Sequence, residues 1–175
     1  AFYVPHHLAH AGYGAYYLPH GRQGIVVSHD GGWPHLPCNA GGVYLATGHG
    51  VYPLFDPQLF VGQLYQRWGE IAGFHPAEAP GKLMGLASYG HPAPGADAIV
   101  ARLLEQAAAG HRWTLESFEQ ALRTILDEGA ELSRQHRGTL AAADSFTFAF
   151  ADRDFSITLA ATAQFIVESV WEQAL

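Results

Sequence analysis

The chain contains 175 residues, of which 49% are hydrophobic, so it can bury one compact core and is not disordered as a whole. Its formal net charge is −7, and its nine Lys and Arg residues are too few and too scattered for a nucleic-acid-binding surface. No apolar run approaches the roughly 20 residues of a membrane-spanning helix, and the single cysteine, Cys38, agrees with the cytoplasmic location that we expect.

The first third of the sequence predicts a strand, a helix and then a hairpin or meander. Residues 1–4 are apolar, and Pro5 suits the first turn of a helix that runs to about residue 17. Two β-rich runs follow, GIVVS at 24–28 and GVYLAT at 42–47. The turn-forming sequence Asp-Gly-Gly follows the first of these runs.

The rest of the chain is predicted to be mainly helical. Apolar residues recur at helical spacing over 57–72, and Gly73 stands where that helix would end. The pair Pro80-Gly81 is predicted to interrupt the chain before an element at 82–89. Beyond it we expect a helix at 96–109, a helix capped by Thr114, a strand at 145–150 and an amphipathic helix at 157–175.

These elements predict a single mixed α/β domain, with a mixed sheet and helices. Residues 1–92 hold the chemically distinctive motifs, 93–156 resemble a mostly helical insertion, and 157–175 begin a long helix. Because the chain opens within a predicted strand and stops within a predicted helix, we expect it to be part of a larger domain.

Histidines are concentrated near the beginning, with six of the eleven in the first 35 residues. His6 and His10 are four residues apart on a predicted helix, so both imidazoles project from one face. With the carboxylate of Asp30, they form a ligand set that suits Fe(II), Zn(II) or Mn(II) and leaves open positions for substrate. The alternative is a capping histidine and a core histidine, and the sequence leaves the two interpretations about even.

Two glycine-containing segments are candidates for phosphate binding. Gly31 and Gly32 would let phosphate oxygens approach backbone N–H groups, although a lone Asp-Gly-Gly is usually an ordinary turn. Lys82 follows Gly81 in GKLMGLASYG, which suits the edge of an anion or nucleotide site, although a surface lysine is the simpler interpretation. No GxSxG sequence occurs, and the catalytic residues stay unassigned.

Taken together, PHHLAHA at 5–11, the turn at Asp30, GQLY at 62–65 and GKLMGLA at 81–87 resemble the O-carbamoyltransferases of nodulation-factor and antibiotic tailoring. The resemblance implies a partial actin-like ATPase fold, shared with the hydrogenase-maturation carbamoyltransferase and the tRNA threonylcarbamoyltransferase. In such enzymes a separate domain makes carbamoyladenylate from carbamoyl phosphate and ATP. The domain resembled here moves the carbamoyl group to the hydroxyl of a small-molecule acceptor.

By position, the resemblance assigns His6, His10 and Asp30 to a divalent metal, with iron as the first expectation. It places the nucleotide against a second set of residues: His29, Gly31, Gly32, Gly81 and Lys82. Two positions depart from the family pattern, since His29 stands where an apolar residue is usual and Pro80 where glutamate is common. His29 is therefore either an extra ligand or the mark of a subfamily with a different acceptor.

The sequence leaves two other functions open. A tRNA-modifying relative is disfavoured by the acidic charge and by the GKLMGLA segment, whereas a non-catalytic metal- or nucleotide-binding fragment agrees with an incomplete domain. We expect this segment to be inactive by itself. We also expect homo-oligomers, because an incomplete domain exposes apolar surface.

Overall fold

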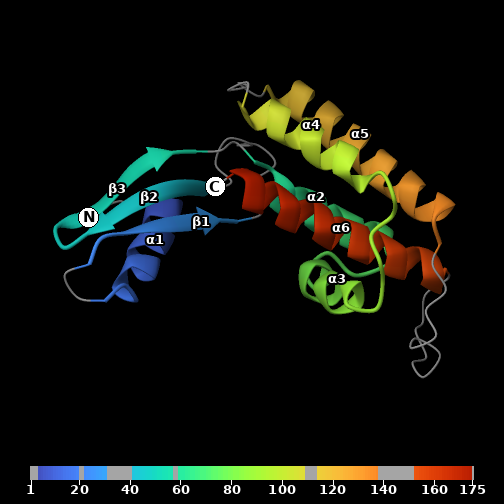
Figure 1. Ribbon diagram of the computed structural model, residues 1–175, viewed down its shortest axis with the longest axis horizontal. Helices are drawn as coiled ribbons and strands as arrows, with labels where there is room; N and C mark the ends of the chain where they lie inside the picture. The colour runs from blue at the N-terminus through green and yellow to red at the C-terminus, as the bar shows by residue number, and fades with distance from the viewer. Residues whose placement is uncertain are drawn as a thin grey trace.

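The computed structural model describes residues 4–19, 22–30, 41–56, 59–108, 114–137 and 152–174. Its elements in chain order are α1 (His6–Tyr16), β1 (Gly24–His29), β2 (Gly41–Thr47), β3 (Gly50–Phe55), α2 (Val61–Ile71), α3 (Ala79–Ala87), α4 (Ala96–Ala108), α5 (Leu115–Gln135) and α6 (Arg153–Ala174). The strands and α1 lie at one end of the molecule, and helices α2 to α6 lie at the other (Figure 1).

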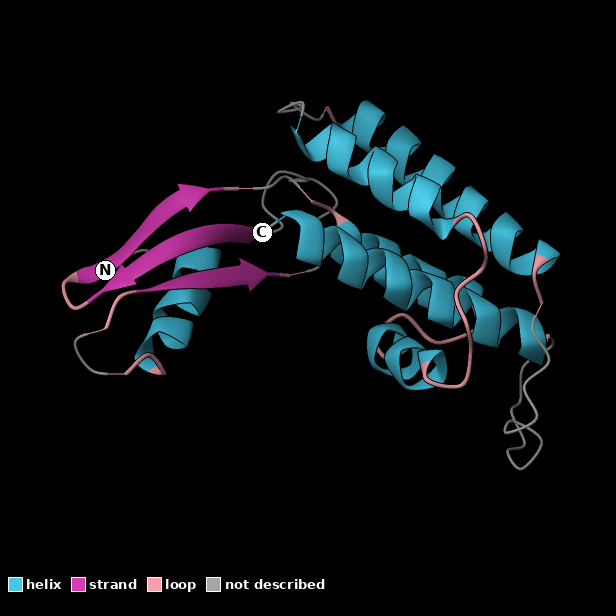
Figure 2. Ribbon diagram, viewed as in Figure 1, coloured by secondary structure: helices cyan, strands magenta, loops and turns pink. Residues whose placement is uncertain are grey.

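The three described strands form an antiparallel meander in the order β1-β2-β3 (Figure 2). Ile25 of β1 lies opposite Leu45 of β2, which in turn lies opposite Tyr52 of β3. Side chains alternate between the faces of a strand. Val26 and Ser28 therefore face α1, whereas Ile25 lies on the other face and is exposed.

Helix α1 packs closely on its face of the sheet. Ala11 is completely buried, and a Cβ at Gly14 would lie 2.8 Å from Cγ1 of Val26. The missing side chain of Gly14 therefore lets the helix backbone approach β1.

The helical part is organised around α6, which contacts α2, α3, α4 and α5. Residues 155–163 are buried on every side, so the amphipathic pattern predicted for this helix holds only for its C-terminal part. Buried hydroxyl groups are satisfied by the backbone: Ser156 Oγ donates to the carbonyl of Ala72 at 3.2 Å, and Thr162 Oγ1 accepts from the N–H of Ala93 at 2.9 Å. None of the described helices combines the length and apolarity that crossing a bilayer requires.

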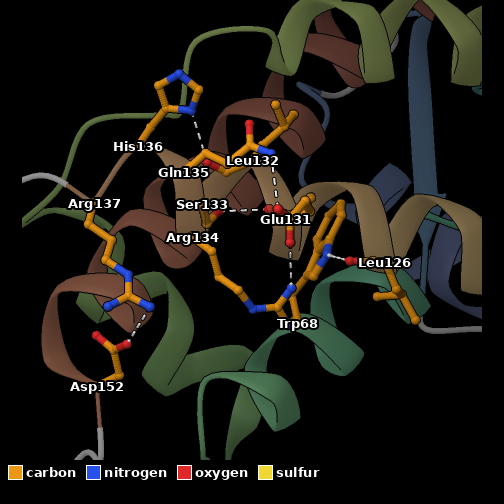
Figure 3. Close-up of polar contacts among 11 residues, drawn as sticks. Trp68, Leu126, Glu131, Leu132, Ser133, Arg134, Gln135, His136, Arg137 and Asp152 are labelled. Atoms are coloured by element: carbon orange, nitrogen blue, oxygen red, sulfur yellow. Dashed lines mark hydrogen bonds and ion pairs between the residues drawn. The ribbon is translucent and has the colours of Figure 1, made fainter.

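Helix α5 is fixed at both ends. Thr114 accepts a hydrogen bond from the N–H of Ser117 at 3.1 Å, which confirms the predicted cap. In the middle of the helix the indole N–H of Trp68 donates to the carbonyl of Leu126 at 3.3 Å (Figure 3). Beyond its last turn, Arg137 forms an ion pair with Asp152 at 3.0 Å, just before α6 begins. The two helices are thus tied together at that end.

Several predictions are confirmed within the described residues, and others need correction. The mixed α/β class, α1, β1, β2 and the helix at 96–109 agree with the sequence interpretation. The described strands are all antiparallel, so the predicted mixed sheet is wrong for them. Pro80 and Gly81 lie in the first turn of α3 rather than before it, because proline is tolerated where no helical N–H bond is needed.

Four sequence interpretations lie outside what the structure tests. Of the strand predicted at 1–4, only residue 4 is among the described residues, and the strand predicted at 145–150 lies entirely outside them. The actin-like ATPase fold and the division of the chain at residue 92 stay predictions.

Candidate metal centre

Two histidines and a carboxylate come together where α1 begins and β1 ends. Nε2 of His6 lies 2.9 Å from Oδ2 of Asp30 and 3.1 Å from Nε2 of His10. Nε2 of His10 lies 4.0 Å from the same carboxylate oxygen. The helical spacing places both imidazoles on one face of α1. Helix α1 packs against β1, and its first residue, His6, lies beside Asp30 at the end of that strand.

The three donor atoms fit a single divalent ion. Bonds from such an ion to imidazole nitrogen and carboxylate oxygen are about 2.0–2.2 Å, so two donors on one ion lie at most about 4.2 Å apart. All three separations satisfy this limit. Two imidazoles and one carboxylate suit Fe(II), Zn(II) or Mn(II), so the predicted ligand set is sterically able to hold the predicted metals.

The cluster is open to solvent. The side chains of His6, His10 and Asp30 are 56%, 54% and 52% exposed. The N-cap residue of α1 is Pro5, which makes no side-chain capping hydrogen bond. The two histidines therefore act neither as cap nor as core, and an ion bound between them would keep a side accessible to substrate.

Two neighbouring histidines are placed differently. His7 is 4% exposed, and its Nδ1 lies 3.1 Å from Oγ of Ser28. His29 faces the opposite side of β1 from Asp30, where its ring packs edge-on against Trp171 at 4.6 Å between ring centroids. Its Nε2 lies 3.3 Å from the carbonyl oxygen of Leu59. His29 thus connects the sheet to the helical part.

Burial controls the charge of His29. Desolvation lowers the pKa of its imidazole, and the hydrogen bond with the Leu59 carbonyl opposes that shift only in part. A neutral His29 is suited to packing against Trp171. It contributes little positive charge for a phosphate group.

The predicted nucleotide-binding residues are not gathered around the metal cluster. Gly81 and Lys82 lie on α3 in the helical part, apart from α1 (Figure 1). Nζ of Lys82 lies 2.5 Å from Oε2 of Glu78, and this contact lowers the pKa of the Glu78 carboxyl. Gly31 and Gly32 lie outside the described residues.

Ser28 is the neighbour of the cluster that the sequence analysis missed. It stands two residues before Asp30, and the two-residue period of a strand places both on the face toward α1. That alternation was a usable signal. Its partner, His7, cannot be identified from the sequence of α1 or of β1, because the pairing depends on how α1 packs against the sheet.

The geometry defines an α/β protein with an open site of two histidines and one carboxylate. The family model described as the carbamoyltransferase N-terminus matches residues 1–171. The chain belongs to this family, which confirms the resemblance seen in the sequence. No curated protein and no solved structure matches the chain.

Proposed function

We propose that this chain supplies the metal centre for transfer of a carbamoyl group from carbamoyladenylate to an acceptor hydroxyl. The observation that carries the proposal is the cluster of His6, His10 and Asp30 in a member of the carbamoyltransferase family. The order of these residues also agrees with the family resemblance, in which the same positions hold a divalent ion.

The chemistry follows from the substrate. The acceptor oxygen attacks the carbamoyl carbon, the bond from that carbon to the phosphate oxygen breaks, and AMP leaves as the acceptor proton passes to a general base. A bound divalent ion supplies charge neutralisation for the leaving phosphate. His6 and His10 would hold that ion through Nε2, and Asp30 would complete the ligand set through Oδ2.

The phosphate and nucleoside are proposed to extend from the metal cluster toward Gly31 and Gly32, whereas His29 faces the other side of β1 and packs against Trp171. Gly81 and Lys82 form a second anion-binding proposal on α3. A Cβ at Gly81 would meet no atom within 4 Å, so its backbone is approachable. Lys82 would exchange its ion pair with Glu78 for a phosphate group.

Metal titration tests the centre directly. Anaerobic calorimetry with Fe(II) and with Zn(II) is expected to show one ion bound per chain, and the His6→Ala, His10→Ala double variant is expected to lose that binding. The matched control is His49→Ala, His91→Ala, which removes two exposed histidines elsewhere. Equal affinity in the two double variants would contradict the assignment.

Carbamoyl transfer is a separate measurement. Release of AMP from carbamoyladenylate is followed with and without a panel of hydroxyl compounds, at saturating Fe(II). Acceptor-dependent AMP release that disappears in His6→Ala, His10→Ala is the expected result for a chain that acts by itself. Metal binding without AMP release would support the non-catalytic fragment and would leave the metal centre intact.

A further inference from the structure

The metal ligands come from two different elements, so their spacing depends on how those elements are placed. The backbone of α1 fixes His6 relative to His10. Asp30 directly follows β1 and belongs to the sheet. Productive metal geometry tolerates errors of only about 0.5 Å, and exposed side chains do not supply that accuracy by themselves. Something between α1 and β1 must set their relative position.

A buried polar contact lies at this boundary. His7 is 4% exposed and Ser28 is 6% exposed, and Nδ1 and Oγ lie 3.1 Å apart. His7 is adjacent to the ligand His6 in the helix, and Ser28 is two residues before the ligand Asp30 on the same face of the strand. The contact is therefore next to the metal cluster on both elements.

The opposite end of the boundary is held by packing. A Cβ at Gly14 would lie 2.8 Å from Cγ1 of Val26, so helix and strand are already in close contact there. Apolar packing fixes the distance between two elements but resists sliding only weakly, whereas a hydrogen bond depends on direction as well as distance. The two contacts thus constrain different movements of α1.

The strand side of the contact is itself rigid. Gly41 of β2 pairs with His29, and a Cβ at Gly41 would lie 2.4 Å from the backbone oxygen of Ser28. The backbone of β2 therefore lies directly against the end of β1. Ser28 is therefore held in place by β2, so its hydrogen bond can set the position of α1.

We propose that His7 and Ser28 are a positioning pair, which sets the placement of α1 along β1 and thereby the separation of His6 and His10 from Asp30. The inference rests on the metal centre proposed above. Neither residue belongs to the group of three side chains that could hold the ion. Loss of either partner leaves the other buried without this hydrogen bond, which favours displacement of α1.

The test measures metal affinity in Ser28→Ala, in His7→Phe and in the double variant, with Zn(II) calorimetry. Each single variant is expected to bind about tenfold more weakly, as for other groups that orient metal ligands. The double variant is expected to lose no more than either single variant, because the two residues act through one contact. His7→Phe retains a ring in the buried position, so the cavity left behind is small.

A control separates positioning from a general loss of stability. Ser156→Ala removes another buried, hydrogen-bonded hydroxyl, on α6, where it contacts Ala72 rather than the cluster. It is expected to lower the melting temperature but to change Zn(II) affinity less than twofold. The visible absorption of bound Co(II) reports ligand geometry and is expected to change in Ser28→Ala and not in Ser156→Ala.

The outcomes are distinguishable. If the Zn(II) affinity of Ser28→Ala stays within twofold of the wild-type value and the Co(II) spectrum is unchanged, the positioning pair is overturned. The proposed metal centre is then unaffected. Additive losses in the double variant also overturn the shared contact. If the wild-type chain binds no Zn(II) or Fe(II), the proposed metal centre fails, and this inference fails with it.

Discussion

Replacing Gly14 by alanine tests how closely α1 must approach the sheet. In an open part of a helix, alanine is favoured over glycine by about 1 kcal/mol. At position 14, however, the new Cβ would lie 2.8 Å from Cγ1 of Val26, about 0.7 Å inside the usual lower limit of a carbon–carbon contact. Valine is stiff at χ1, so the contact is relieved mainly by moving α1 away from β1.

The expected magnitude follows from these opposing effects. Overpacking costs about 1–3 kcal/mol, so Gly14→Ala is expected to change the free energy of unfolding by between zero and a loss of about 2 kcal/mol. Gly12→Ala is the matched control on the same helix, because a Cβ there would meet no atom within 4 Å. It is expected to raise the free energy of unfolding by up to about 1 kcal/mol.

Urea unfolding followed by circular dichroism compares the two variants, and Zn(II) calorimetry is repeated on both. Gly14→Ala is expected to weaken metal binding, since it separates Asp30 from His6 and His10, whereas Gly12→Ala leaves binding unchanged. Val26→Ala in the Gly14→Ala background is expected to restore part of both losses. Equal stabilisation by Gly14→Ala and Gly12→Ala would refute the packing argument.

Three further predictions concern other parts of the chain. Burial lowers the pKa of His29, so below about pH 6.5 the imidazole takes up a proton more readily in the unfolded state than in the folded state. The folded protein therefore loses stability as the pH falls. Thermal melts at pH 7.5 and 5.5 should show a smaller drop in melting temperature for His29→Phe than for the wild type. Thr114→Ala removes the cap of α5 and should cost about 1 kcal/mol in urea unfolding. The exposed side chains of Ile25 and Tyr52 should promote self-association of the chain. Analytical sedimentation should show less self-association in the double variant Ile25→Lys, Tyr52→Lys. A wild-type chain that stays monomeric at high concentration would contradict this.

Local patterns were sufficient for most of the described elements. Pro5 and the end of the apolar pattern locate α1, and Thr114 locates the beginning of α5, because caps act within one turn. The strand β3 was not predicted, since Pro53 interrupts its sequence pattern. Proline is tolerated there because β3 lies at the edge of the described sheet, where one side of the strand needs no ladder partner.

The candidate site shows the same division between local and tertiary information. The spacing of His6 and His10 is a property of one helix, so the sequence predicts their common face. The approach of Asp30 depends on α1 packing against β1, and the family resemblance supplied that information. The identity of the buried histidine does not follow from the run HHLAH, because packing alone decides that His7, rather than His6, faces the sheet.

The arrangement also explains why adjacent residues on β1 serve different purposes. Asp30 faces α1 and completes the cluster, whereas His29 faces the other way and contacts Trp171 and Leu59. The period of the strand thus directs one side chain toward the ligands and its neighbour toward the helical part. Because His29 packs against Trp171, the backbone that carries Asp30 is supported from the side opposite α1. The three proposed ligands are therefore held by α1 and β1, and the helical part supports Asp30, the one that is not on the helix.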